Sequence, residues 1–372
     1  MENTKVFITG LGSLSALGYG AEETWENLKN QKELSKKENW DNDKIKPQFF
    51  GEAADINFEE EVDWMDRFSP KKYSKLGILA CKKALEDAGI KAESNNDIGL
   101  IIETSLGATE SVEDYLYDLF LKGIAKVSPI KFTKTVANTV LGDVSRAFSL
   151  KGPSSLIFNE SSVSYGFDLI KKGVADIVIC GGVDHYSSFR ILSEQEEGNL
   201  SLDNHKNDSK RSVLGEGAAF IVLESEKSIR QRGKKPYAEI LNENYVFDYN
   251  NVEATTIRSS FVTERAAELL SDNYQDQTIA FLSGFANDTQ HIDNEETLLR
   301  NISAKNDVYT FVHKKYTGDM KSASAVMGLS IASQILSNNY IPEKEISKKV
   351  DLAFVSAVHE GGGSSQFLLK QA

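Results

Sequence analysis

The chain has few cysteines, few histidines and no long apolar run. Its 372 residues include only 2 cysteines, Cys81 and Cys180, and 5 histidines. Two cysteines cannot form the disulfide framework of a small secreted protein, so we expect the protein in a reducing cytoplasm. No apolar run approaches the about 20 residues that a membrane-spanning helix needs. We therefore expect no membrane as a partner.

Basic residues are also in deficit. The chain carries 42 Lys and Arg against 55 Asp and Glu, which gives a formal charge of −13. Phosphate binding needs a basic face, so this balance argues against nucleic acid and anionic lipid as partners. The apolar residues 6–12 follow no basic segment, and we interpret them as a first strand and not as a secretion signal.

Short apolar strands alternate with helical stretches along the chain. This alternation is typical of a layered α/β fold with mixed sheets. The two halves show the same order of elements, which suggests an old duplication, and we place their boundary at residues 231–236, between halves at 1–235 and 236–372. The polar residues 193–212 predict a long surface loop in the first half. The predicted helices are residues 21–28, 74–88, 110–121, 135–148 and 164–172, followed by 263–270, 293–301 and 324–336.

Several stretches, in order along nearly the whole chain, carry a family resemblance. Together they resemble the β-ketoacyl-acyl-carrier-protein synthases of the thiolase superfamily. This resemblance implies a thiolase-like layered α/β/α/β/α fold with two pseudo-duplicated halves and mixed sheets. The matching stretches are an opening strand with its glycine turn at 6–18, helix motifs at 65–68 and 84–89, a strand with paired glycines at 173–184, an edge strand at 213–224 and a glycine loop at 361–365.

The position of the catalytic nucleophile departs from this family. The residues between Gly152 and Gly182 resemble the frame around the cysteine that takes the acyl chain in the family. That cysteine acts as a thiolate, activated by the positive end of a helix. Here the position is held by Ser161, which follows Glu160. An unassisted serine is a poor nucleophile at neutral pH, so a hydrolase or acyltransferase using Ser161 would need a base nearby.

Both histidine positions of the family depart as well. In ketosynthases two histidines help to decarboxylate the malonyl extender and hold the developing oxyanion. Phe285 stands at the first position, and His291, six residues later, is the candidate for a local replacement. At the second, the motif keeps Lys314 with its threonine and glycine, but Asp319 replaces the histidine. The loss of all three groups predicts that no catalytic site is intact and that the chain alone does not condense.

Other side chains have structural interpretations beside the functional ones. We expect Cys81 and Cys180 to be buried structural thiols, since each lies in an apolar stretch. Lys314 is expected to form an ion pair with a buried carboxylate. The C-terminal loop carries His359 and Glu360 where the family usually has Phe and Gly near an acyl gate.

The family is dimeric, and the resemblance implies an interface around the strand that ends at the nucleophile turn. In some polyketide and polyene systems an active ketosynthase pairs with a degenerate copy, the chain-length factor, which shapes the acyl tunnel. Its cysteine is often replaced by a glutamine after a glutamate, and Glu160-Ser161 is similar in outline. We therefore expect a heterodimer with a Cys-containing ketosynthase, through which the chain would serve an acyl carrier protein. The expected interface residues are Ser155, Leu156, Ile157, Phe158, Asn159 and Asn138.

The helix expected at 110–121 corresponds in the family to one that lines the acyl tunnel. Tyr117 and Phe120 are three residues apart, on adjoining parts of one helix face, and are our candidates for a gate that stops chain growth. Ordinary core packing is the alternative for each. Aryl polyene, polyketide and fatty-acid pathways stay open, as do a homodimer, a homodimeric acyl-binding protein and an enzyme using Ser161. No cofactor and no metal are expected.

Overall fold

The computed structural model describes residues 4–63, 70–91, 97–200, 213–247, 276–284, 306–346, 348–359 and 362–372, together with residues 274, 297 and 300. The strands of the first half are β1 (Val6–Ser15), β2 (Gly18–Tyr19), β5 (Gly99–Thr104), β6 (Ser154–Phe158), β7 (Ile177–Asp184) and β8 (Gly217–Ser225). Those of the second half are β9 (Ala238–Phe247), β10 (Thr278–Leu282), β11 (Asp307–Phe311), β12 (Leu352–Val358) and β13 (Gly363–Gln371). The short strands β3 (Lys36–Lys37) and β4 (Gln48–Phe49) pair separately.

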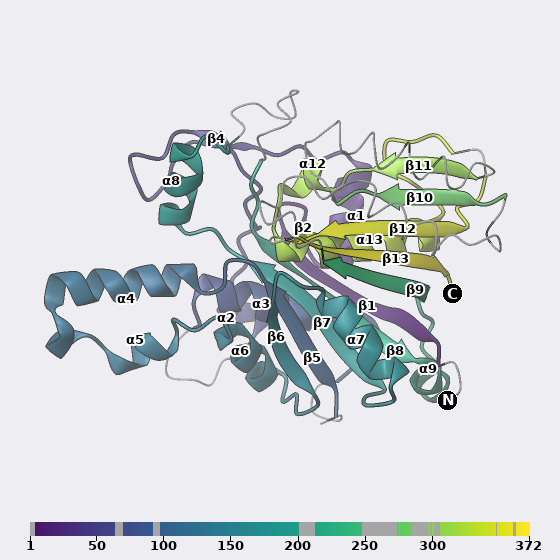
Figure 1. Cartoon of the computed structure of the whole chain (residues 1–372), viewed down its shortest axis with the longest axis horizontal. Helices are drawn as coiled ribbons and strands as arrows, with labels where there is room; N and C mark the ends of the chain where they lie inside the picture. The colour runs from purple at the N-terminus through teal and green to yellow at the C-terminus, as the bar shows by residue number, and fades with distance from the viewer. Residues whose placement is uncertain are drawn as a thin grey trace.

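Helices lie between these strands and cover the sheet (Figure 1). In the first half they are α1 (Ala21–Lys29), α2 (Phe58–Glu61), α3 (Lys72–Ala88), α4 (Thr109–Lys122), the 3₁₀ turn η2 (Ile124–Lys126), α5 (Pro129–Thr133), α6 (Thr139–Ala147), α7 (Ser162–Lys171), α8 (Ser188–Glu196) and α9 (Glu226–Arg232). The second half contributes α12 (Lys314–Thr317) and α13 (Ser322–Asn338).

The two halves have the same strand order. The 11-stranded sheet runs β11-β10-β12-β13-β9-β1-β8-β7-β5-β6, with β2 beside β1. From the central pair outward, β1-β8-β7-β5-β6 and β9-β13-β12-β10-β11 each have two antiparallel pairings followed by two parallel ones. The halves join where β1 pairs with β9. This repeat confirms the expected α/β fold of pseudo-duplicated halves.

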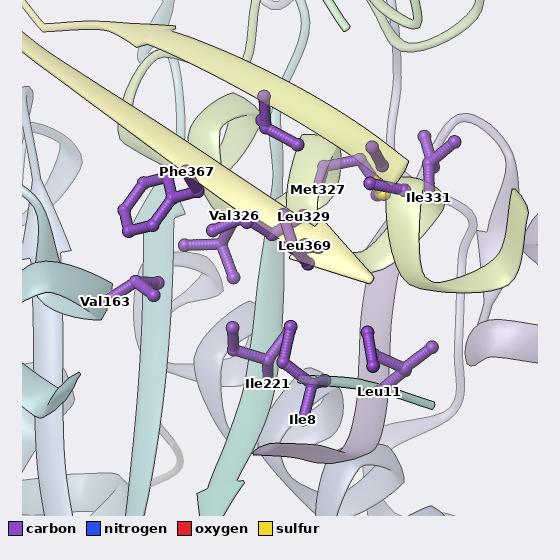
Figure 2. Packing of buried hydrophobic residues seen from close by; sticks show 14 of the residues in the cluster. Ile8, Leu11, Val163, Ile221, Val326, Met327, Leu329, Ile331, Phe367 and Leu369 are labelled. Carbon is purple, nitrogen blue, oxygen red and sulfur yellow. The ribbon is translucent and has the colours of Figure 1, made fainter. Parts of the chain in front are cut away.

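The core is divided into layers by the sheet, because alternate strand residues point to opposite faces. In β10, Ile279 and Phe281 belong to an outer cluster, whereas Ala280 and Leu282 belong to the central one. The central cluster is built around α13, which contacts strands of both halves, and around α7. The helices α3 and α6 cover the other face of the first half. Figure 2 shows the central packing of Ile8, Leu11, Val163, Ile221, Val326, Met327, Leu329, Ile331, Phe367 and Leu369.

The sequence predictions needed three corrections. The stretch at 213–224 was expected as an edge strand, but β8 lies inside the sheet, paired with both β1 and β7. Residues 135–148 were expected to form one helix, but they contain a break before α6. The hydroxyls of Thr135 and Thr139 donate to the Phe132 and Val136 carbonyls, and such local bonds compete with a continuous helix. The loop expected at 193–212 is also wrong at its start, because α8 continues to Glu196. Three other predicted stretches lie outside the described residues. They are the rest of the loop at 201–212, the helix at 263–270 and, apart from residues 297 and 300, the helix at 293–301.

The expected boundary at residues 231–236 falls at the link between the two sets of strands. There α9 ends at Arg232, Gly233 adopts a left-handed conformation with φ 65°, and β9 begins at Ala238. The division into domains at 1–235 and 236–372 stays a prediction. In the part of the chain that the structure describes, no helix combines the length and apolar character of a membrane span.

Candidate functional site

The turn between β6 and α7 holds the predicted nucleophile position. Asn159 has a φ of 52°, in the left-handed region that asparagine tolerates, and its N–H donates to the Thr104 carbonyl over 3.3 Å. Ser161 is the N-cap of α7, and its Oγ accepts a hydrogen bond from the Ser164 N–H at 3.2 Å. Its side chain therefore satisfies one of the free donors of the helix start.

A second donor of the helix start is satisfied by Glu103, at the end of β5. This glutamate is fully buried, and its Oε1 accepts from the Ser162 N–H at 3.1 Å and from the Ser162 Oγ–H at 2.8 Å. The sequence analysis missed this residue. The signal was present, since a single acidic residue follows the apolar run 100–102 within the buried strand.

His359 continues this polar cluster from the opposite side. It follows β12, is 3% exposed, and its Nδ1 lies 3.5 Å from Glu103 Oε2. Its Nε2 lies 3.0 Å from Oγ of Ser365, which is fully buried on β13. The ring centroids of His359 and Tyr245 are 6.3 Å apart. Side chains from β5, β9, β13 and the link after β12 therefore meet at the start of α7.

Burial keeps this cluster uncharged at neutral pH. It raises the pKa of Glu103 to about 8, although the hydrogen bonds from Ser162 act in the opposite direction. Burial, together with the nearby Lys314 ammonium, lowers the pKa of His359 to about 4. A protonated Glu103 thus faces a neutral imidazole, and the two groups do not form an ion pair.

The second histidine position contains an ion pair. Lys314 begins α12, and its Nζ lies 3.0 Å from Asp319 Oδ1, with the two side chains 9% and 16% exposed. Burial alone would raise the pKa of Asp319, but Lys314 and Lys321 hold it well below its usual range. Lys314 thus makes the expected pairing with a buried carboxylate, and that carboxylate is Asp319 itself.

The remaining candidates are two cysteines and two residues outside the described ranges. Phe285 and His291 belong to the latter group. Cys81 and Cys180 are fully buried, and burial raises both thiol pKa values, which agrees with the structural role expected for them. In the described ranges, no group of three or more His, Cys, Asp or Glu side chains is arranged to hold a metal ion.

The predicted gate residues lie on an arm that extends from the body. Figure 1 shows α4 and α5 projecting away from the sheet. Tyr117 and Phe120 are 67% and 82% exposed there, so neither is a core residue of the chain by itself. Other exposed apolar side chains of this arm are Leu121, Ile124, Ile130 and Phe132.

The predicted interface strand β6 is the last strand of the sheet. Phe158 is 52% exposed at its end, while Ile157 is partly buried against the central cluster and Leu156 against the cluster under α3 and α6. Ser155 is also partly buried, and Asn138, the N-cap of α6, is exposed.

Comparison with known proteins decides the family. The family model for the β-ketoacyl synthase N-terminal domain matches residues 3–228. The chain belongs to the β-ketoacyl synthase family. Its similar relatives include the 3-oxoacyl-[acyl-carrier-protein] synthase 2 of Staphylococcus aureus (strain COL), 28% identical over 68% of this chain. The synthase 2 of Rhizobium meliloti (strain 1021) is 30% identical over 64% of the chain. The matches span 65% and 63% of the lengths of these two relatives.

Solved structures of ketosynthases share the fold of this β-ketoacyl synthase family member. The ishigamide ketosynthase/chain length factor aligns with a TM-score of 0.87 at 17% identity, over 100% of both chains. A type II PKS acyl-carrier protein in complex with its ketosynthase bound to the hexaketide aligns with a TM-score of 0.80 at 18% identity, again over 100% of both chains. At these identities the likeness shows the fold alone.

Proposed function

We propose that this ketosynthase-family chain is a non-catalytic subunit of the chain-length-factor type. It pairs with an active β-ketoacyl synthase and shapes the acyl tunnel of the complex. The observation that carries the proposal is that side chains of the protein itself bind the N–H groups at the α7 N-terminus. Its Ser162 and Ser164 N–H groups, which could stabilise a thiolate or an oxyanion, are bound by Glu103 and Ser161.

The surroundings of Ser161 support a loss of chemistry. In the described part of the chain, its hydroxyl is bonded to the Ser164 amide and to no histidine. The ring of His359 instead faces Ser365 and Glu103. The Lys314–Asp319 pair adds an ionised carboxylate at the motif position where ketosynthases hold an oxyanion-stabilising histidine.

The outer surface of the first half supports pairing. Among the described strands β6 pairs with β5 alone and ends the sheet, and edges of this kind are open to pairing with another chain. The adjoining arm exposes Phe120 and Ile124 by 82% and 84%. Large apolar side chains at such exposure are typical of an interface with another protein. A Cys-containing ketosynthase fits this surface as a partner, and the acyl carrier protein would deliver substrate to that partner.

Replacement of Ser161 by alanine is expected to leave the condensing activity of the complex within about twofold of the unmodified complex, because Ser161 acts as a helix cap. The test co-expresses the chain with a ketosynthase that retains the cysteine and both histidines, and measures product from acyl- and malonyl-carrier protein. The matched control replaces the partner's cysteine with alanine and abolishes the product. Product from the purified chain alone, or an acyl adduct on Ser161, would contradict the proposal.

Replacement of Tyr117 or Phe120 by alanine is expected to lengthen the product of the complex by at least one extension unit, because bulky side chains on the α4 face would no longer stop the growing chain. Mass spectrometry of the released products measures this. Phe189→Ala is the matched control, since Phe189 is an equally exposed aromatic residue, at 67%, on α8. An unchanged product distribution in both arm variants would remove these residues from the gate.

A further inference from the structure

The space beside residue 161 is closed by the chain's own side chains. Ser161 is 5% exposed, and Glu103 and Ser365 are fully buried. On the side of β13, a methyl group added to Gly363 would lie 2.7 Å from the Tyr245 hydroxyl and 3.1 Å from the Asn159 carbonyl oxygen. An additional carbon atom here would have to displace the Tyr245 hydroxyl and crowd the Asn159 carbonyl, so the space between this strand and the turn is tight.

The order Ser365–His359–Glu103 is that of a hydrolytic triad, but the cluster does not have the properties of one. The triad mechanism needs an ionised acid that accepts a hydrogen bond from the histidine. Burial instead raises the pKa of Glu103 to about 8, so its carboxyl is protonated at neutral pH. The candidate nucleophile Ser365 is also fully buried within β13, in contact with neighbouring strands on both sides.

We propose that Glu103 and His359 form an internal plug, which occupies the α7 N-terminus and excludes acyl thioesters from residue 161. Glu103 takes the place of an external anion on the Ser162 N–H. His359 fills the space between Glu103 and β13, and the hydrogen bond between its Nε2 and Ser365 Oγ holds the ring there. The inference rests on the proposed function for the identity of the excluded group.

The plug has a consequence for attempts to restore a nucleophile. A cysteine placed at residue 161 would be shielded by the plug, and the Ser162 N–H, one of the helix donors that lower a thiol pKa, would remain bound to Glu103. Truncation of the plug would free both the space and the Ser162 N–H group. Reactivity at residue 161 should therefore depend on residues 103 and 359, which are remote from it in sequence.

The test measures alkylation of Ser161→Cys by iodoacetamide in the full chain, with and without Glu103→Ala and His359→Ala. The plug-free variant is expected to react at least about tenfold faster, because access and the helix donors both favour the thiolate. The native Cys81 and Cys180, both buried, are internal controls and should stay unmodified. Peptide mass spectrometry reports the three sites separately.

Equal rates with and without the plug, while Cys81 and Cys180 stay protected, would overturn the proposal. Glu103→Gln in the Ser161→Cys background keeps the volume of the plug and is expected to react within about twofold of Ser161→Cys. If the two native cysteines react in the doubly truncated variant, its fold has opened. In that case the alkylation rate of Ser161→Cys is compared with and without the single truncation His359→Ala. Equal rates, with Cys81 and Cys180 protected, would again overturn the proposal. Because labelling needs no second subunit, its outcome is independent of whether the chain pairs with a ketosynthase.

Discussion

Replacement of Lys314 by alanine is expected to lower the free energy of unfolding by about 3–5 kcal/mol, as removal of one partner of a buried ion pair does. Lys314 Nζ lies 3.0 Å from Asp319 Oδ1, whereas Lys321 Nζ lies 4.0 Å from Asp319 Oδ2. Without Lys314, the Asp319 carboxylate would remain largely buried. The more distant Lys321 ammonium and hydrogen bonds from the Lys321 N–H and the Ser324 hydroxyl would be left to stabilise it. We therefore infer a structural role for Lys314, tied to Asp319 at the predicted position of the family's second histidine.

Urea unfolding followed by circular dichroism measures this loss, and the neighbouring Lys315→Ala is the matched control. Lys315 is 42% exposed and 3.8 Å from Glu343, and exposed pairs of this kind contribute at most about 1 kcal/mol. The combined variant Lys314→Met, Asp319→Leu removes both charges and is expected to recover most of the lost stability. A Lys314→Ala loss no larger than that of Lys315→Ala would show that the pair does not stabilise the fold.

The elements around the site could be predicted because local patterns determine them. The strand at 155–158 and the helix after Ser161 are close to the observed β6 and α7. The helix start is set by a serine N-cap, which is a short-range signal. The glycine at 166 lies where α7 crosses β7, since an added Cβ would be 2.2 Å from Cys180 Sγ. The close packing of α7 on β7 therefore buries the Cys180 thiol. This burial had been predicted from the apolar sequence around Cys180.

The plug could not be predicted, because its members are distant in sequence. Glu103 and His359 are 256 positions apart, and no local pattern brings β5 to the link after β12. The arm that carries α4 shows a second limit of prediction from sequence. The spacing of Tyr117 and Phe120 correctly places them on one helix face, but spacing alone cannot say whether that face meets the core or solvent. The structure shows that both residues are exposed in this chain.

Glu103→Gln is expected to stabilise the protein, by an amount that grows with pH. The pKa of Glu103 is about 8 in the folded chain, against an ordinary value of 4.5. Below pH 4.5 both states are protonated and burial carries no charge penalty. As the pH rises to about 8, the unfolded state ionises first, and the unmodified protein loses stability. Glutamine mimics the protonated acid, because its amide oxygen can accept from Ser162 while its NH₂ faces His359 Nδ1.

The difference in the free energy of unfolding between Glu103→Gln and the unmodified protein is measured from about pH 5 to about pH 9. We expect it to rise to the order of 5 kcal/mol at the alkaline end, since the pKa of Glu103 moves from 4.5 to about 8 and each pKa unit corresponds to about 1.4 kcal/mol. Groups remote from Glu103 titrate equally in both proteins and cancel in the difference. Asp184, Cys180 and Tyr245 interact with its charge and add to the pH dependence. The control Glu22→Gln, at an exposed position in the first turn of α1, should stay within about 0.5 kcal/mol throughout. A difference for Glu103→Gln that is independent of pH, or that falls as pH rises, would mean that Glu103 is ionised in the fold and that the plug is held by charge.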